Sequence, residues 1–269
     1  MSDANARHPI TLKPVVLRLE GMESVVVERD VTYASSIAGP LTMDVYRPPG
    51  TVAYRAPVVA IVAGYRDVGV PLPLGCAFKD MAMCDSLGRL LAVSGIAAVA
   101  YTARNPAADI HTVLDRLEAD AEALDVDAAR VGVWAVSGNV PVALSALARR
   151  ADGRIRAAVF SNGFMFDAEG STAVADAARS YGFVNPAGMS ARDLPRDVPM
   201  FVMRAGRDEN AGLNASLDRF VGDALALNLP VTVVNEPAAR HAFELHEDTD
   251  VARHHVARML AFMRYWLTA

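Results

Sequence analysis

A serine stands where the residue pattern of the chain changes abruptly. Residues 131–136 form a short apolar run, which is typical of a buried strand. After Ser137, apolar residues recur at the spacing of one helix face, as Val140, Leu144 and Leu147. A sharp turn from strand to helix can hold a serine in a strained backbone conformation and expose its hydroxyl. The pattern therefore predicts either a reactive Ser137 or an ordinary turn in which Ser137 caps the helix.

The neighbours of Ser137 bear on whether it suits nucleophilic chemistry. The sequence reads Ala135-Val136-Ser137-Gly138-Asn139, whereas the nucleophile elbow is usually written G-x-S-x-G. Ala135 differs from the first glycine by one methyl group, and Asn139 replaces the last glycine, where helix and strand pack closely. The Gly138 N–H at the start of the predicted helix could stabilise developing negative charge. Ser137 is therefore our candidate nucleophile.

A serine nucleophile needs a base, and the base needs an acid that orients it. Asp208 comes just after the strand-like run VPMFVMRAG, and His241 comes just after the run LPVTVVNEP. The carboxyl ends of parallel strands lie at one edge of a sheet, so we expect Ser137, Asp208 and His241 to meet there. Glu209 is an alternative acid, but Asp208 directly follows the Ala-Gly-Arg turn and is preferred.

The other histidines have a plainer interpretation. His246, His254 and His255 lie in or near the last predicted helix, where we expect a solvent-exposed face. The stretch HAFELHED does not match a zinc signature such as H-E-x-x-H. The sequence therefore predicts neither a metal site nor a cofactor.

The elements that must position these residues alternate between apolar runs and amphipathic segments. Apolar runs typical of strands buried on both faces occupy residues 56–64, 95–102, 130–136, 155–163, 198–206 and 229–237. Helical spacing follows Ser137 and appears in residues 77–94, 105–124, 213–227 and 250–267. Extended, β-branched segments at residues 13–19, 23–35 and 41–48 predict antiparallel strands. This order predicts an α/β fold: a mostly parallel sheet with antiparallel N-terminal strands and helices on both faces.

Length and composition limit the class of protein. The 269 residues are 52% hydrophobic and 21% charged, which suffices for one domain with a sizeable core. We interpret residues 1–269 as a single domain with 164–197 as a cap or lid insertion, because that segment is too long for a simple connection. The net charge of −5 argues against nucleic acid and anionic membranes as partners. A polar N-terminus, no membrane-length apolar run and only two cysteines predict a cytoplasmic protein without a disulfide framework.

With these motifs the chain resembles the α/β-hydrolase-fold serine esterases, close to the dienelactone hydrolase-like and small carboxylesterase groups. The resemblance covers nearly the whole chain and is carried by LTMDVYRPPG, PVVAIVAGYRDVG, SGIAAVAYTARNP, DVDAARVGVWAVSGN, RAGRDEN and RHAFEL. It implies the α/β-hydrolase fold. By position it also implies that Ser137 is the nucleophile, Asp208 the acid and His241 the base.

The loop that would complete an oxyanion hole departs from the pattern of these esterases. Many relatives carry His-Gly-Gly where this chain has Ala63-Gly64-Tyr65. We expect the Tyr65 and Gly138 N–H groups to form the hole, with Gly64 letting the loop approach and bordering the substrate pocket. The Tyr65 ring is an alternative pocket wall, and Arg66 and Asp67 could form an ion pair or contact a polar substrate.

Aromatic and apolar residues after the strand 155–163 suggest a substrate pocket. Phe164, Met165 and Phe166 could wall an acyl or aryl site, or could anchor the insertion, to which Tyr181 and Phe183 belong. A partly covered apolar site favours a small or medium carboxylic ester, including a lactone or thioester. The alternatives are an acyltransferase or a non-catalytic ligand-binding protein. The terminal helix or an edge strand could support a homodimer.

Overall fold

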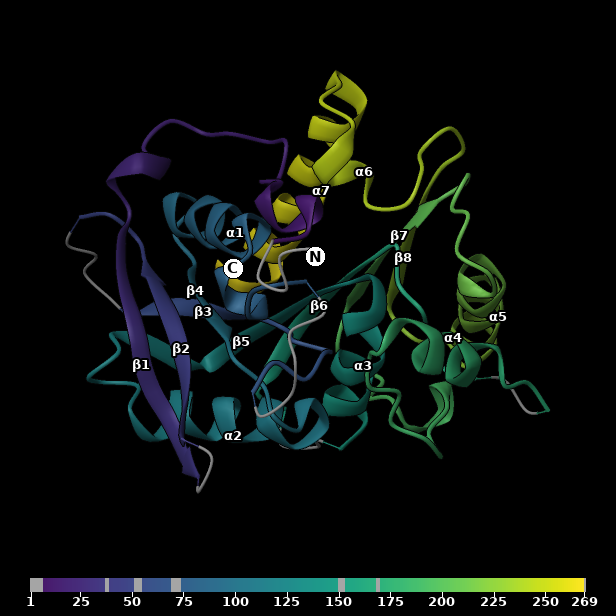
Figure 1. Cartoon of the computed structure of the whole chain (residues 1–269), viewed down its shortest axis with the longest axis horizontal. Coiled ribbons are helices and arrows are strands. Elements are labelled where there is room, and N and C mark those ends of the chain that lie inside the picture. The colour runs from purple at the N-terminus through teal and green to yellow at the C-terminus, as the bar shows by residue number, and fades with distance from the viewer. Residues whose placement is uncertain are drawn as a thin grey trace, which may run out of the picture.

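The computed structural model describes residues 7–36, 39–50, 55–68, 74–149, 153–167 and 170–268. In that part of the chain, one eight-stranded sheet has the order β1-β2-β4-β3-β5-β6-β7-β8 (Figure 1). The strands are β1 (Val26–Ser36), β2 (Gly39–Arg47), β3 (Ala56–Ile61), β4 (Ala97–Tyr101), β5 (Val126–Val136), β6 (Ile155–Ser161), β7 (Met200–Ala205) and β8 (Val231–Glu236). Pairs β1–β2 and β2–β4 are antiparallel, and the other pairs are parallel. The predicted fold class is therefore confirmed.

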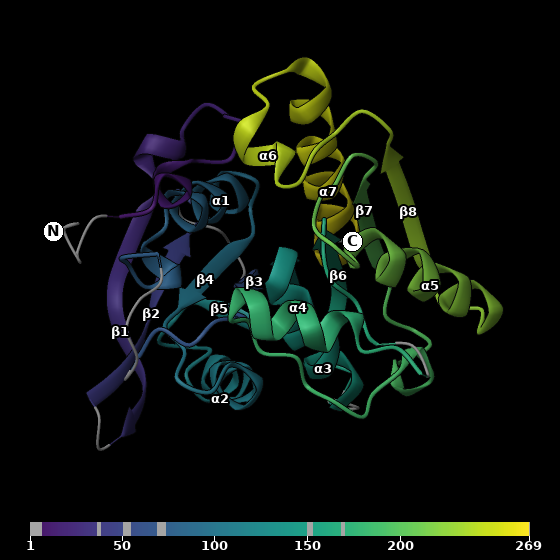
Figure 2. The same ribbon diagram turned by 45° about the vertical axis from the view of Figure 1, so that its right-hand side comes forward.

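Helices cover both faces of this sheet. They are α1 (Ala82–Val93), α2 (Pro106–Ala119), α3 (Val140–Arg149), α4 (Ala173–Tyr181), α5 (Leu213–Ala226), α6 (Phe243–His246) and α7 (Asp250–Thr268). Figure 2 shows α1, α6 and α7 on one side of the sheet and α2, α3 and α4 on the other. Every residue of β3 and β4 is buried, as the continuous apolar runs predict. No helix among the described residues has the length and apolar character needed to cross a membrane.

The predicted first strand, residues 13–19, is wrong. Its backbone forms hydrogen bonds with helices and not with the sheet. Val15 N–H donates to Ser86 Oγ of α1 at 2.9 Å. Val16 N–H donates to the Glu244 carbonyl of α6, also at 2.9 Å. The β-branched residues that suggested a strand thus tie the N-terminal segment to the helices beside the site.

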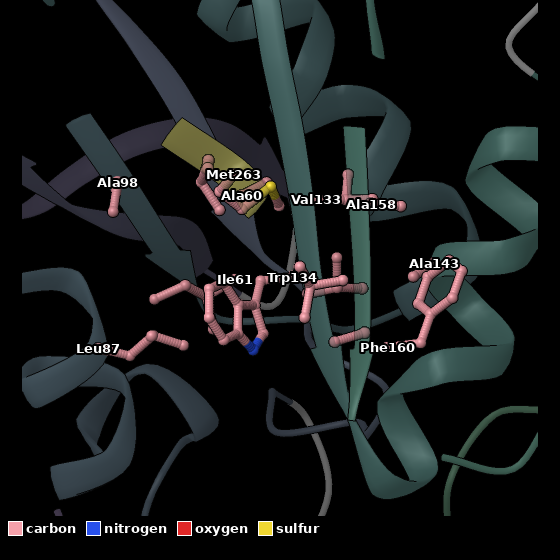
Figure 3. Packing of buried hydrophobic residues seen from close by; sticks show 14 of the residues in the cluster. Ala60, Ile61, Leu87, Ala98, Val133, Trp134, Ala143, Ala158, Phe160 and Met263 are labelled. Atoms are coloured by element: carbon pink, nitrogen blue, oxygen red, sulfur yellow. The ribbon is translucent and has the colours of Figure 1, made fainter. Parts of the chain in front are cut away.

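The core holds β5, the strand that directly precedes Ser137, in a rigid setting. Trp134 of β5 lies among buried residues of the neighbouring strands, including Ile61 and Phe160 (Figure 3), and its side chain is almost fully buried. On β5, Gly132 lets α7 approach, because a Cβ there would lie 3.0 Å from Leu267 Cδ1. A strand packed on both faces leaves little room for its carboxyl end to shift.

The segment 164–197, of which residues 168–169 are not described, contains α4 and a 3₁₀ turn at Ala191–Asp193. Four of its apolar residues, Phe164, Val174, Ala177 and Phe183, form a small cluster with Leu213 of α5, whereas Met165, Ala191 and Leu194 belong to the main core. The segment also reaches the predicted oxyanion loop, because Val184 N–H donates to the Gly64 carbonyl at 2.8 Å. That this segment acts as a lid stays a prediction.

Candidate active site

Ser137 lies at a strained turn between β5 and α3. Its φ angle is 54°, in the left-handed region that side-chain-bearing residues seldom adopt. The next residue must be small, because a Cβ on Gly138 would lie 2.6 Å from the Tyr65 hydroxyl and 2.7 Å from Phe183 Cδ1. Strain of this kind persists where the surroundings fix the backbone, and it is concentrated at functional sites. The turn therefore has the geometry that the altered elbow motif suggested.

Asn139, which replaces the last glycine of the motif, bridges two elements. Its Oδ1 accepts a hydrogen bond from Gly64 N–H at 2.6 Å, and its Nδ2 donates to the Val136 carbonyl at 2.9 Å. Gly64 in turn comes so close that a Cβ on it would lie 2.5 Å from Asn139 Cα. The asparagine thus fixes the predicted oxyanion loop against the nucleophile turn, a role that the motif comparison did not suggest.

The structure brings Ser137, His241 and Asp208 together. Ser137 Oγ lies 2.9 Å from His241 Nε2, and His241 Nδ1 lies 2.6 Å from Asp208 Oδ2. Asp208 lies just after β7, where Asn210 binds its other oxygen through its backbone N–H (3.0 Å) and through Nδ2 (2.9 Å). Glu209, the alternative acid, instead lines a separate groove with Arg207 and Arg240. These hydrogen bonds form one chain from the serine hydroxyl to a buried carboxylate.

The environment keeps Asp208 ionised. Its side chain is fully buried, which disfavours the charge, but the hydrogen bond and attraction of His241, aided by Asn210, lower the pKa of the carboxyl below its usual value. An ionised Asp208 holds the proton of His241 on Nδ1 and leaves Nε2 free to accept the serine proton.

His241 lies in the loop after β8, directly before α6. The next residue, Ala242, has a φ angle of 53°, so the chain turns sharply there into the short helix. The His241 side chain remains 28% exposed, so its Nε2 edge is reachable from the cavity that contains Ser137. After this turn, residues of α6 line the same cavity as His241.

The loop after β3 has a half-buried carboxyl group at its base. Asp67 accepts hydrogen bonds from Ala103 N–H (2.6 Å) and Phe78 N–H (2.9 Å), and burial raises its pKa to about 6. These bonds fix the loop to the end of β4, and they take the place of the Arg66–Asp67 ion pair considered from the sequence. Arg66 itself is exposed and lines the cavity. Among the described residues, Tyr65 N–H donates to no other backbone or side-chain group.

Two connected spaces open on Ser137. The inner cavity has a volume of 330 Å³, and its wall is mainly apolar. It is lined by Ile10, Tyr65, Arg66, Asp67, Leu74, Cys76, Phe78, Met81, Met83, Val136, Ser137, Asn139, Asn162, Tyr181, His241, Ala242, Glu244, Leu245 and His246. The outer groove adds His8, Pro9, Lys13, Phe164 and Asn210 to residues shared with the inner cavity. Elements from both faces of the sheet therefore enclose the serine.

The four predicted pocket residues, Gly64 among them, do not line the inner cavity. Gly64 is buried against Asn139. Phe164 lines the outer groove, where it stacks on Phe183 with ring centroids 5.1 Å apart. Met165 is fully buried in the main core, and Phe166 packs against Phe220 of α5, so neither lines a space that contains Ser137. The prediction of Met165 and Phe166 as pocket walls is wrong, because the chain turns into the core after the end of β6.

Two polar residues of the inner cavity were not predicted from the sequence. Asn162 follows β6, and Glu244 lies on α6 three residues after His241. Both are buried, and Asn162 has a φ angle of 47°. Their only signal in the sequence is a charged residue within the apolar stretch HAFEL and a polar residue at a strand end.

The expectation of an exposed histidine face on the last helix is wrong for His255. This residue is buried, and its Nε2 lies 3.1 Å from Glu236 Oε2 at the end of β8. The pair links α7 to the sheet and lies away from the cavity. In the described part of the chain, no group of three His, Cys, Asp or Glu side chains has the arrangement to hold a metal ion.

Several solved structures resemble this one over most of the chain. A bacterial heroin esterase has a TM-score of 0.72 and 16% sequence identity, covering 94% of this chain and 88% of that chain. An esterase of Pyrobaculum calidifontis has a TM-score of 0.68 and 20% identity, covering 92% and 89%. An α/β hydrolase from a Medee basin deep-sea metagenome library has a TM-score of 0.67 and 14% identity, covering 91% and 99%.

No family model matches the sequence, and no curated protein matches it. Sequence identities of 14% to 20% to the solved structures leave the likeness at the level of architecture. The sheet order, the strained serine turn and these structural neighbours agree: the chain has the α/β-hydrolase fold.

Proposed function

We propose that the protein is a serine hydrolase that cleaves a small or medium carboxylic ester through an acyl-Ser137 intermediate. The observation that carries this proposal is the hydrogen-bond chain from Ser137 Oγ through His241 to Asp208, which opens on an apolar cavity. The esterases among the structural neighbours support it at the level of the fold. Lactones and thioesters fall within the same chemistry.

The reaction uses each member of the chain in turn. His241 Nε2 takes the proton of Ser137 as Oγ attacks the ester carbonyl, and Asp208 stabilises the imidazolium that forms. When the tetrahedral intermediate collapses, the carbon–oxygen bond to the alcohol breaks and His241 gives its proton to the departing oxygen. Water then enters and attacks the acyl carbon while it gives a proton to His241 Nε2. When the second tetrahedral intermediate collapses, the bond between the acyl carbon and Ser137 Oγ breaks, His241 returns the proton to Oγ, and the acid is released.

The oxyanion of each tetrahedral intermediate needs donors that are already in place. We assign this role to the N–H groups of Tyr65 and Gly138. Gly138 lies in the first turn of a helix, where N–H groups have no partner within the helix, and Tyr65 N–H donates to no described residue. The hydrogen bond from Gly64 to Asn139 would keep the two donors at a fixed separation. Loss of one such donor typically lowers kcat by about 10² to 10³-fold.

The cavity supports a modest substrate. Its 330 Å³ lies at the lower end of the range of small-molecule sites, and its wall favours an apolar acyl or alcohol part. Segment 164–197 would cover the substrate, since Tyr181 and Phe164 border the spaces beside Ser137. A cytoplasmic location, a homodimer, and the lack of nucleic-acid and membrane partners stay predictions.

Labelling with a neutral fluorophosphonate tests the proposal directly. Intact-mass spectrometry of the wild type should show one adduct, because only an activated serine attacks phosphorus readily. Ser137→Ala should show none, and Ser190→Ala, which removes an exposed hydroxyl, should label like the wild type. Absence of an adduct on folded wild-type protein would favour the alternative of a non-catalytic ligand-binding protein. An acyltransferase would label too, and transfer to an added alcohol instead of water would reveal it.

A further inference from the structure

The inner cavity contains a carboxyl group that the proposed mechanism does not use. Glu244 is only 5% exposed, and both of its oxygens accept hydrogen bonds from neutral groups. Ser161 Oγ donates to Oε1 at 3.0 Å, and Asn162 Nδ2 donates to Oε2 at 2.7 Å. Among the described residues, no lysine or arginine forms an ion pair with Glu244. A carboxylate in this position lacks a compensating positive charge.

The surroundings of Glu244 are mainly apolar, so the absence of a compensating positive charge is energetically important. Behind it lies a small void lined by apolar side chains, including Trp134, Val136 and Met259. Burial there raises the pKa of Glu244, and the hydrogen bonds from its own backbone N–H, from Ser161 and from Asn162, together with the nearby His241, only partly offset the effect. Keeping a carboxylate ionised in such a place is unfavourable unless a partner cation is supplied.

Asn162 adds a second acceptor beside this carboxyl. Its Nδ2 is used twice, since it donates to Ser161 Oγ at 3.0 Å as well as to Glu244. Its Oδ1 is buried and has no hydrogen-bond partner among the described residues. The left-handed backbone at Asn162 holds the amide at the cavity, although this conformation is strained. The subsite therefore has spare acceptors and no spare donor.

The rest of the wall also suits a positive group. The aromatic side chains of Tyr65, Phe78 and Tyr181 line the same cavity, and aromatic faces attract cations. The other carboxyl there, Asp67, is already bound by two backbone N–H groups. Arg66 is exposed, where water screens its charge.

We propose that Glu244 and Asn162 form a subsite for a protonated amine, so that the substrate is an ester carrying an ammonium group. The amine would donate its N–H bonds to Glu244 and to Asn162 Oδ1, in the cavity that contains Ser137. The subsite rests on the proposed function, because it names the substrate class of the same cavity.

A competition experiment on the wild type tests the subsite first. Labelling of Ser137 by a neutral fluorophosphonate is followed with two competitors of equal shape, 2-(dimethylamino)ethanol, which is cationic at pH 7, and neutral 3-methylbutan-1-ol. The amine should protect Ser137 at a concentration about 30-fold lower, the effect of a buried charge pair. Equal protection by the two alcohols overturns the subsite while the labelling itself upholds the serine hydrolase; no labelling at all overturns the proposed function.

Substitution then identifies the group responsible. Glu244→Gln keeps the shape and should lower the ratio of kcat/KM for 2-(dimethylamino)ethyl butyrate over 3-methylbutyl butyrate by about 30-fold. Glu247→Gln removes an equal charge just after α6, outside the inner cavity, and should leave the ratio unchanged. If Glu244→Gln lowers kcat/KM for both esters by the same factor, Glu244 acts through His241 and the amine subsite is overturned.

Discussion

Two buried carboxyls near Ser137 differ in the direction in which the protein shifts their pKa. Asp208 has its pKa lowered, since burial is outweighed by His241 and the two Asn210 bonds. Glu244 has its pKa raised, since burial outweighs the hydrogen bonds from its own backbone N–H, from Ser161 and from Asn162, and the effect of the nearby His241. Burial is common to both, so the direct partner decides the ionisation.

This difference separates two uses of a buried acid. Asp208 has a direct cationic partner once His241 accepts a proton, and therefore suits a group that stabilises charge during the reaction. Glu244 has no direct cationic partner in the chain, and therefore suits recognition of a charge that comes with the substrate. The comparison leads to predictions in which the two carboxyls respond differently.

The largest difference should appear in catalysis. Asp208→Asn should lower kcat/KM for a neutral ester by about 10⁴-fold, because His241 loses the partner that fixes its tautomer. Glu244→Gln should lower it far less, because the glutamine oxygen can still accept from Asn162 Nδ2 and the glutamine Nε2 can donate to Ser161 Oγ, which reverses that bond. Initial rates with 3-methylbutyl butyrate measure both variants. Glu209→Gln, which removes the adjacent carboxyl, serves as the control for Asp208. If Glu209→Gln lowers kcat/KM as much as Asp208→Asn does, the assignment of Asp208 as the acid is wrong.

Asn139 has a neutral side chain, so its contribution should come only from holding Gly64 in place, unlike those of the two carboxyls. Asn139→Ala removes the acceptor of Gly64 N–H and should lower kcat by about 100-fold, through displacement of the oxyanion loop. KM should change little if the ground state does not use this loop. Asn139→Asp keeps the acceptor and should recover part of the rate. A normal kcat in Asn139→Ala would show that the loop holds its place without the bridge.

The hydrogen-bonded set of Ser137, His241 and Asp208 was predictable from the sequence because each member follows a strand of a parallel sheet. Ser137, Asp208 and His241 all stand at carboxyl ends, so their convergence follows from topology. The role of Asn139 was not predictable, since its partner Gly64 is 75 residues away and a motif comparison registers only a missing glycine. The fold can be predicted from local periodicity. Side-chain partners cannot, because they depend on contacts between segments that are distant in the sequence.

The same limit applies to the pocket. Aromatic composition after β6 suggested Met165 and Phe166, but the direction of the chain there takes both away from the cavity. Glu244 gave only a weak signal, because one charge in HAFEL is equally compatible with an exposed helix face. Its burial becomes evident only when the N-terminal segment, α6 and the end of β6 are seen together.

A smaller effect should come from the amide that supports Asp208. Asn210→Ala removes the Nδ2 donor but leaves the backbone N–H, which already binds the same oxygen at 3.0 Å. We expect kcat/KM for a neutral ester to fall by about 10-fold, the lower end of the effect of one hydrogen bond to a charged group, because the backbone N–H remains. A loss as large as that of Asp208→Asn would mean that the amide, more than His241, holds the carboxylate in place.

The smallest effect concerns stability, where the opposite pKa shifts predict opposite pH dependence. A carboxyl with a raised pKa in the folded state contributes stability at pH values below its unfolded pKa of 4.5, and this contribution is lost as pH rises through the folded pKa. Asp208, with a lowered pKa, contributes stability above 3.8 that is lost as pH falls. Urea unfolding of the wild type and Glu244→Gln at pH 5 and pH 8 should therefore show the variant gaining relative stability at pH 8. Glu247→Gln should show no such gain. A difference between wild type and Glu244→Gln that stays constant over this range would mean that Glu244 is ionised throughout, and the contrast with Asp208 would then come from geometry alone.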